Sequence, residues 1–295
     1  MKIPFSENSA AHWYHQTAKP AYTMEVTTGK NAGQTRNTTL RDARKLNLLP
    51  SITGILRCYP KAQLDKWIKE QAVLARHNNP PPEEAAAPLD SFRDCNEAQR
   101  VYFDHVERLA NRIRDEACAR GNAIHMAAEN ILAGRSFDER NPHAVAVKGW
   151  IDANVETVFF TEKSVVNLDL NVAGRLDACA GLRDGPRPIV LDYKGRAFAH
   201  TKKHGWRAKR RKSDLIQLAF YASTMSDAPR IANLYVANDR DEPLIELVEY
   251  TDEERQTAFG VLESLVKIWQ FENNYVPEID HEKILKHLEA QNGAG

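Results

Sequence analysis

Apolar positions three and four residues apart dominate the first half of the chain, and this spacing predicts amphipathic helices. A helix start is expected at residues 50–53, where Ser51 or Thr53 can serve as the N-cap. The spacing over 98–117 predicts a long helix that Gly121 interrupts and that resumes as far as residue 134. A further helix is expected over 144–158.

The apolar period then changes to two, which is typical of strands. Three strands are expected, with a turn at 184–186 between the last two, and a helix and two more strands follow the basic stretch after them. Thr251 and Glu254 form a capping box that starts a C-terminal helix. The expected strands are 165–168, 172–182, 188–194, 231–237 and 244–250, and the helix covers 213–225. This alternation predicts an α/β fold.

The length of 295 residues fits either two units or one large α/β domain. Three consecutive prolines at 80–82 require a loop or linker. We therefore expect an extended and helical N-terminal region over 1–92, with a proline-rich linker near 78–90. A core with C-terminal helices is expected over 93–295, and the two parts are expected to form one integrated structural unit.

Composition excludes several classes of protein. With 42% apolar and 27% charged residues, the chain is neither disordered nor fibrous. It holds no apolar stretch near the ~20 residues of a membrane span and no secretory h-region at its start. Its four cysteines stand far apart, which disfavours a disulfide scaffold and a zinc ribbon. Asn31 follows Gly29-Lys30 where a P-loop needs Ser or Thr, so no ATP-driven motor is expected.

The formal net charge is zero, but the charges are unevenly distributed. Residues 187–212 hold ten Lys/Arg and one acid, a net charge of +9. Residues 238–295 hold 14 acids and five bases, a net charge of −9. A basic stretch by itself is most often a solvated face, so its meaning depends on the residues around it.

The strand over 189–195 carries the most informative polar residues. Because side chains alternate along a strand, Asp192 and Lys194 lie on one face about 7 Å apart. If the preceding strand forms a hairpin with this one, Asp177 lies near Asp192. Two converging carboxylates make a hard-oxygen site for Mg²⁺ or Mn²⁺. The structural alternative is a salt-bridged end of the sheet, in which Asp192 pairs with Arg175 or Lys194.

Two further pairs stand on predicted helices. Gly121 precedes His125 by one helical turn, and Gln217 shares a helix face with Tyr221. A single histidine or tyrosine of this kind is more often a core residue than a ligand or a contact. Their order along the chain is more specific: Gly-x-x-x-His, an Asp in a strand, Asp-x-Lys, and Gln-x-x-x-Tyr in a helix.

That order resembles the RecB-like branch of the PD-(D/E)XK nuclease superfamily, and within it the phage-encoded and mitochondrial genome maintenance-type exonucleases. The specific motifs cover residues 121–237, and a weaker similarity extends to 48–56 and Trp67. The chain departs from the superfamily's pattern modestly, with Leu176 in place of the proline and Asp192 in place of the alternative Glu. The resemblance implies a restriction endonuclease-like core, a mixed central β-sheet flanked by helices, with a helical N-terminal part that arches over the site.

The resemblance also implies roles for individual residues. Asp177 and Asp192 would bind the metal, with His125 as an additional ligand and the backbone carbonyl of Tyr193 completing the shell. Lys194 would orient or help to deprotonate the attacking water and offset the charge of the phosphate. The expected cofactor is one or two Mg²⁺ or Mn²⁺ ions. Iron–sulfur members of this branch carry several cysteines after the core, which this chain lacks, so no cluster is expected.

Two helical residues complete the implied catalytic set. Gln217 would hold the Asp-x-Lys strand or its water network, and Tyr221 would face the DNA backbone. The residues assigned to DNA are basic or aromatic and stand in or before the basic stretch. They are Arg175, Lys202, Lys203, Trp206, Arg207, Lys209, Arg210, Arg211 and Lys212.

These features together predict a metal-dependent DNA exonuclease in recombination, repair or replication. The expected substrate is single-stranded DNA or DNA with free ends. A single-strand annealing or binding protein is an expected partner, and a membrane is not. The expected location is the cytoplasm, that of a bacterial host if the protein is phage-encoded. An endonuclease of the same fold and a nucleic-acid-binding protein that does not cut are the alternatives.

Overall fold

A computed structural model describes residues 12–60, 62–89, 91–185, 187–227, 229–282 and 284. It divides into two compact units, one formed by residues 1–59 with 124–295 and the other by residues 60–123. None of the helices within the described ranges has the length and apolar character that crossing a membrane requires.

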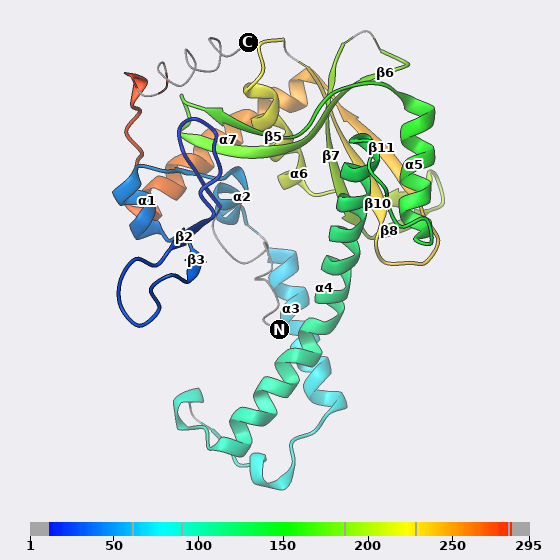
Figure 1. The fold of residues 1–295 in the computed structure, drawn as a ribbon. Helices are drawn as coiled ribbons and strands as arrows, with labels where there is room; N and C mark the ends of the chain where they lie inside the picture. The colour runs from blue at the N-terminus through cyan, green and yellow to red at the C-terminus, as the bar shows by residue number, and fades with distance from the viewer. Residues whose placement is uncertain are drawn as a thin grey trace. The chain divides into compact units, whose positions relative to one another are not determined.

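The larger unit contains a five-stranded mixed sheet with the strand order β11-β10-β7-β6-β5 (Figure 1). Strands β10 and β7 run parallel, with α6 between them in the chain, and the other neighbouring pairs are antiparallel. This arrangement confirms the predicted α/β class with a mixed central sheet. The strands are β5 (Val155–Asn167), β6 (Val172–Leu182), β7 (Ile189–Arg196), β10 (Arg230–Ala237) and β11 (Ile245–Tyr250).

Helices cover both faces of this sheet. On one face, α6 (Lys212–Ser223), α7 (Asp252–Asn273) and α2 (Ile52–Ile55) form a core with β5, β6, β7 and β10. On the other face, α5 (Pro142–Asn154) and the end of α4 (Glu97–Leu132), from Ile124 onward, pack on β6, β7 and β10. The core is therefore the helix-flanked sheet of a restriction endonuclease-like fold.

Short elements complete the two units. In the larger unit these are β1 (Trp13–Tyr14), β2 (Thr23–Glu25), β3 (Thr35–Asn37), α1 (Leu40–Leu46), β4 (Leu49–Pro50) and the 3₁₀ turn Leu56–Cys58. The hairpin of β8 (Phe198–Thr201) and β9 (Gly205–Ala208) follows β7. The smaller unit holds α3 (Ala62–Asn78), two 3₁₀ turns (Glu83–Ala85 and Phe92–Asp94) and most of α4.

Several boundaries differ from those that the sequence predicts. Helix α4 continues through Gly121, because a single glycine costs only about 1 kcal/mol of helix propensity in a helix that runs from Glu97 to Leu132. The predicted helix over 144–158 ends at Asn154, and β-branched and aromatic residues from Val155 onward form the start of β5. Helix α1 and the β8–β9 hairpin were not predicted. The predicted caps at Ser51 and Thr251 are confirmed.

A close contact between β6 and α6 depends on Gly174. A Cβ at this position would lie 2.8 Å from Phe220, 2.9 Å from Tyr221 and 3.0 Å from Ile52. We expect Gly174→Ala to destabilise the protein by about 1–3 kcal/mol, as overpacking of a core does. The measurement is thermal unfolding of the variant beside the wild type.

Gly260→Ala is the matched control, because a Cβ at Gly260, within α7, meets nothing within 4 Å. It is expected to raise stability by up to about 1 kcal/mol, the helix propensity that alanine adds. Equal melting temperatures for Gly174→Ala and the wild type would show that α6 does not depend on this close approach.

Candidate active site

The β6–β7 hairpin brings the two predicted carboxylates together. Its antiparallel register pairs Ala178 with Leu191 and Cys179 with Val190, which continues to Asp177 opposite Asp192. The Asp177 Oδ2 atom accepts a hydrogen bond of 2.9 Å from the backbone N–H of Tyr193. The predicted hairpin is thus present, although Pro186 of its turn lies outside the described residues.

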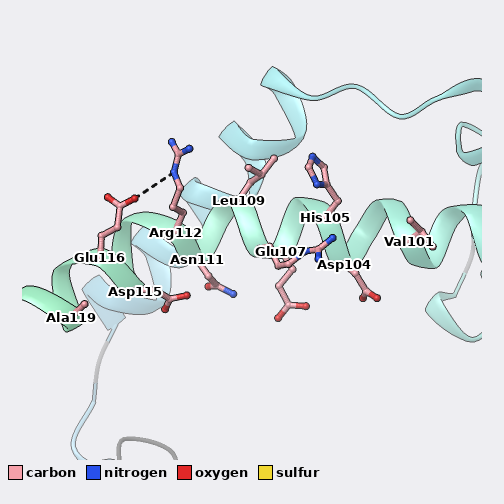
Figure 2. A pocket seen from close by; sticks show the side chains of 11 residues that line it. Val101, Asp104, His105, Glu107, Leu109, Asn111, Arg112, Asp115, Glu116 and Ala119 are labelled. Carbon is pink, nitrogen blue, oxygen red and sulfur yellow. Dashed lines mark ion pairs between the residues drawn. The ribbon is translucent and has the colours of Figure 1, made fainter. Parts of the chain in front are cut away.

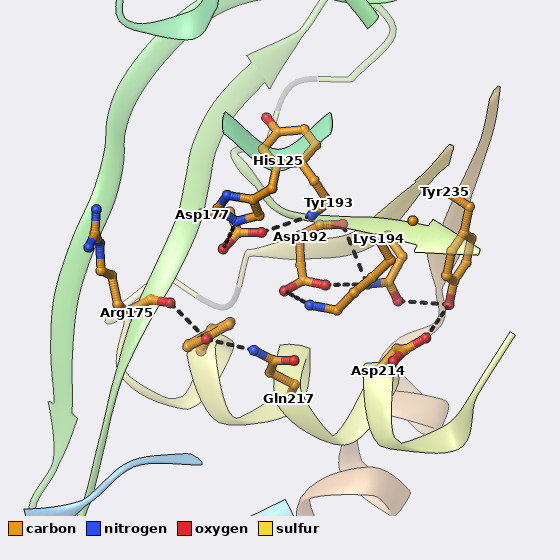
Figure 3. A network of polar contacts seen from close by, with 12 residues as sticks. His125, Arg175, Asp177, Asp192, Tyr193, Lys194, Asp214, Gln217 and Tyr235 are labelled. Carbon is orange, nitrogen blue, oxygen red and sulfur yellow. Dashed lines mark hydrogen bonds and ion pairs between the residues drawn. The ribbon is translucent and has the colours of Figure 1, made fainter. Parts of the chain in front are cut away.

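Asp192 is fully buried, with 0% of its surface exposed. Its Oδ1 accepts a hydrogen bond of 2.7 Å from Lys194 Nζ, and its Oδ2 accepts one of 2.7 Å from Asn233 Nδ2 (Figure 3). Burying a carboxylate is costly unless it is paired and hydrogen-bonded, and both conditions are met here. The sequence interpretation placed Asp192 and Lys194 on one strand face, and the contact between them agrees with it.

His125 approaches Asp177 from the end of α4. Its Nε2 lies 3.1 Å from Asp177 Oδ1, and 36% of its side chain is exposed. The imidazole is therefore a partner of the buried carboxylate and remains accessible from solvent. His125 and Asp177 are 52 residues apart in the chain, and the fold brings them into contact.

Glu162 is a site residue that the sequence interpretation missed. It lies on β5 in the left-handed region, with a φ of 51°, and its Oε2 pairs with Arg175 of β6. Its Oε1 lies 3.9 Å from His125 Nε2. Three side chains each offer one ligand atom, and these atoms lie within 4.8 Å of one another: His125, Glu162 and Asp177. The β-branched and aromatic run of β5 was the available signal, but the sequence predicts a helix over 144–158 and a strand only from residue 165, and Glu162 lies between them.

Charge and burial act against each other in this cluster. Burial and the nearby charge of Asp177 raise the pKa of Glu162 to about 6. Burial disfavours a charged His125, but the hydrogen bond to Asp177 and the negative charges nearby outweigh it and raise its pKa to about 9. Burial likewise opposes ionisation of Asp177, while the hydrogen bond from His125 brings its pKa below the usual value. The cluster is thus a concentration of negative charge that positive neighbours stabilise.

The Asp192–Lys194 pair shows the same competition. Burial raises the pKa of Asp192, although the charge of Lys194 opposes the shift. Burial disfavours the ammonium of Lys194, but Asp192 and Asp177 together raise its pKa above the ordinary value. Lys194 therefore remains a fixed positive charge beside two buried carboxylates.

The donor set of this cluster fits a divalent cation. The Glu162 Oε1 atom is buried and makes no hydrogen bond with any described residue. Such an orphaned carboxylate oxygen is costly unless a positive charge or a donor faces it. Carboxylate oxygens suit Mg²⁺ and Mn²⁺, and an imidazole suits Mn²⁺ better than Mg²⁺.

Gln217 and Tyr221 lie on the buried face of α6. The Gln217 Nε2 donates to the Tyr221 hydroxyl over 2.8 Å, and that hydroxyl donates to the backbone carbonyl of Arg175 over 2.8 Å (Figure 3). These bonds connect α6 to β6, one residue before Leu176 and two before Asp177. In the structure, the contacts of this pair therefore support the strand of the first aspartate.

The basic stretch forms the β8–β9 hairpin and the start of α6. Eight of the predicted DNA-binding side chains are exposed there: Lys202, Lys203, Trp206, Arg207, Lys209, Arg210, Arg211 and Lys212. Arg207 and Arg210 both contact Glu246 of β11, at 3.8 Å and 2.6 Å. The guanidinium of Arg240, which the sequence interpretation did not single out, lies 3.8 Å from the centre of the Trp206 ring. Part of the basic charge is therefore neutralised, and one face of the indole is covered.

A hollow on the smaller unit has a different character. Side chains of α4 between Val101 and Ala119 line it, and they mix acids, bases and apolar residues (Figure 2). Arg112 and Glu116 form an ion pair of 3.8 Å across one helical turn there. None of the predicted site residues lines this hollow, and within the described ranges the cluster that could hold a metal ion is His125, Glu162 and Asp177 instead.

Comparison with known proteins identifies the class of protein. The family model of the PD-(D/E)XK nuclease superfamily matches residues 72–282, which include the sheet and both aspartates. The chain belongs to this superfamily. Nucleases of this superfamily are hydrolytic enzymes, and they generally use divalent metal ions.

Solved structures that are similar to the chain include two of low sequence identity. One is a candidate exonuclease from Eubacterium rectale, with 15% identity over 39% of this chain and 45% of that chain and a TM-score of 0.29. The other is the protein SSO0001, with 14% identity over 71% of this chain and 86% of that chain and a TM-score of 0.30. The chain thus spans less than half the length of the first. No curated protein matches it.

Proposed function

We propose that this nuclease is a metal-dependent DNA exonuclease of the RecB-like branch, similar to phage-encoded and mitochondrial genome maintenance-type enzymes. The observation that carries the proposal is the convergence of His125, Glu162 and Asp177 beside the Asp192–Lys194 pair. A structural salt bridge explains the pair, but it leaves the buried Glu162 Oε1 without a hydrogen bond from any described residue.

In this proposal, Asp177, Glu162 and His125 hold a Mg²⁺ or Mn²⁺ ion, with Asp192 and the carbonyl of Tyr193 on the opposite strand as further ligands. A bound divalent ion supplies Lewis acidity and lowers the pKa of water. Lys194 supplies a fixed positive charge near the attacked phosphate, where negative charge grows in the transition state.

The DNA path is proposed to follow the β8–β9 hairpin. This hairpin continues the chain directly from β7, the strand of Asp192 and Lys194, and it exposes Lys202 and Lys203. Lysine side chains that neutralise phosphates supply most of the sequence-independent affinity for nucleic acid. Trp206 keeps 41% of its surface exposed, which leaves part of the indole available to an unpaired base.

We also propose that the enzyme prefers DNA with free ends. Its proposed role is in recombination, repair or replication in the cytoplasm. Both proposals rest on the family resemblance of the sequence. A single-strand annealing or binding protein is the proposed partner. An endonuclease of the same fold would use the same site, so the two proposals differ in their substrate.

Linear and covalently closed circular single-stranded DNA separate these two functions. We expect the linear DNA to be shortened progressively to small products in Mg²⁺ or Mn²⁺, while circles of the same sequence survive. Gel analysis of end-labelled and circular substrates measures this. Rapid linearisation of closed circles by the wild type, with an inert Asp192→Ala variant, would reject the exonuclease and favour the endonuclease.

A further inference from the structure

Asn233 is a fully buried polar residue at the centre of the sheet. It lies on β10 directly beside Asp192 in the parallel register between β10 and β7. Its Nδ2 donates a hydrogen bond of 2.7 Å to Asp192 Oδ2. No sequence motif pointed to this residue, because an asparagine in a central strand carries no periodic or spacing signal.

The amide of Asn233 is itself held in one orientation. Its Oδ1 lies 3.0 Å from the Tyr250 hydroxyl and 3.2 Å from the Tyr235 hydroxyl. The Tyr235 hydroxyl also lies 3.3 Å from Asp214 Oδ2. Because each hydroxyl has one proton, a satisfied arrangement has Tyr250 donating to Asn233 and Tyr235 donating to Asp214. With its oxygen so occupied, the amide presents its N–H to Asp192.

The far end of this chain of hydrogen bonds is anchored by an ion pair. Asp214 of α6 accepts hydrogen bonds from Arg196 Nη2 at 2.5 Å and from Arg196 Nε at 3.2 Å. Arg196 is the last residue of β7, two positions after Lys194. The network therefore begins and ends on the strand that carries Asp192, and it crosses β10 and α6 between.

We infer that Asn233 is the positioning residue of Asp192 and fixes the carboxylate in the orientation that the reaction needs. Lys194 Nζ on Oδ1 and Asn233 Nδ2 on Oδ2 constrain the carboxylate from two sides. Without the amide, the buried Oδ2 loses this hydrogen bond, and the carboxylate must rotate or lose its charge. This inference rests on the proposed function, since it gives Asp192 a role in the reaction.

The test compares Asn233→Leu with the wild type by steady-state kinetics on linear DNA in Mn²⁺. We expect kcat to fall about 10–100-fold, the loss typical of residues that orient metal ligands. The affinity for DNA should stay unchanged, because Asn233 is buried. Ile231→Val is the matched control. Ile231 lies on the same strand and is 1% exposed, so the variant loses packing and is expected to keep the wild-type kcat.

Tyr250→Phe serves if the leucine variant does not fold, because it keeps the ring and removes the hydroxyl that donates to Asn233 Oδ1 and lies 3.1 Å from the Tyr235 hydroxyl. A smaller fall in kcat is expected, again with unchanged DNA affinity. An unchanged kcat in a folded Asn233→Leu variant would overturn the inference. If Asn233→Leu does not fold and Tyr250→Phe does, an unchanged kcat in Tyr250→Phe would overturn it. If Asp192→Asn loses all activity in the same assay, the proposed function would still hold.

An inactive wild type would instead reject the proposed function. Calorimetric titration with Mn²⁺ would then decide the inference, because a disoriented Asp192 weakens binding of the ion. We expect Asn233→Leu to bind Mn²⁺ more weakly than both the wild type and Ile231→Val. Equal affinity in the three proteins would overturn the inference.

Discussion

Asp192→Asn is expected to lower the rate of DNA hydrolysis by at least about 10²–10³-fold, the scale of removing one electrostatic contact to a transition state. The amide keeps the shape of the carboxylate, and its oxygen can still accept the hydrogen bond of Asn233. It lacks the negative charge that Lys194 faces at 2.7 Å. Single-turnover kinetics beside a DNA-binding assay should show lost cutting with retained binding.

Asp152→Asn is the control for this variant, because Asp152 is an exposed acid of α5 that pairs with Lys148. It should cut at the wild-type rate. Lys194→Met should also lose cutting, and it leaves a buried carboxylate without its cation, which costs about 3–5 kcal/mol of stability. Near wild-type turnover in Asp192→Asn would remove Asp192 from the reaction.

Asp177→Asn and Glu162→Gln are expected to weaken Mn²⁺ binding by at least about 10–100-fold, a loss that even outer partners of metal ligands cause. Each variant removes a negative charge from the cluster in which ligand atoms lie within 4.8 Å of one another. Calorimetry or electron paramagnetic resonance of Mn²⁺ measures the affinity without any need for catalysis.

Glu129→Gln is the matched control for the two metal-site variants. Glu129 lies one helical turn after His125 on α4, and it pairs with Arg135 at 2.6 Å rather than with the cluster. We expect its Mn²⁺ affinity to equal that of the wild type. Equal weakening by Glu129→Gln and Glu162→Gln would mean that general negative charge, and no defined site, attracts the ion.

The strand pattern made the centre of the site predictable. Alternation along β7 gives Asp192 and Lys194 one face, and a turn between two apolar runs indicates the hairpin that places Asp177 opposite. Both inferences depend on the period of two, which burial enforces on central strands. The capped start of α7 follows from the capping box of Thr251 and Glu254, whereas the family resemblance implied the mixed sheet.

The residues that the sequence did not reveal depend on tertiary contacts. Glu162 enters the site because β5 begins within the predicted helix over 144–158 and pairs with β6 along the segment that contains residue 162. Asn233 enters it through the parallel pairing of β10 with β7, across a crossover that leaves no signal at residue 233. Arg240 covers Trp206 from the turn between β10 and β11, 34 residues later in the chain.

The central claim is that the cluster beside the β6–β7 hairpin hydrolyses DNA with a divalent cation. Release of labelled nucleotides from linear DNA, by wild type and Asp192→Asn in EDTA and then in added Mg²⁺ or Mn²⁺, tests it most directly. The account predicts release by the wild type in Mg²⁺ or Mn²⁺ and by neither protein in EDTA, with Asp192→Asn inert throughout. Cutting by the wild type in EDTA, or equal cutting by the two proteins in metal, would contradict it.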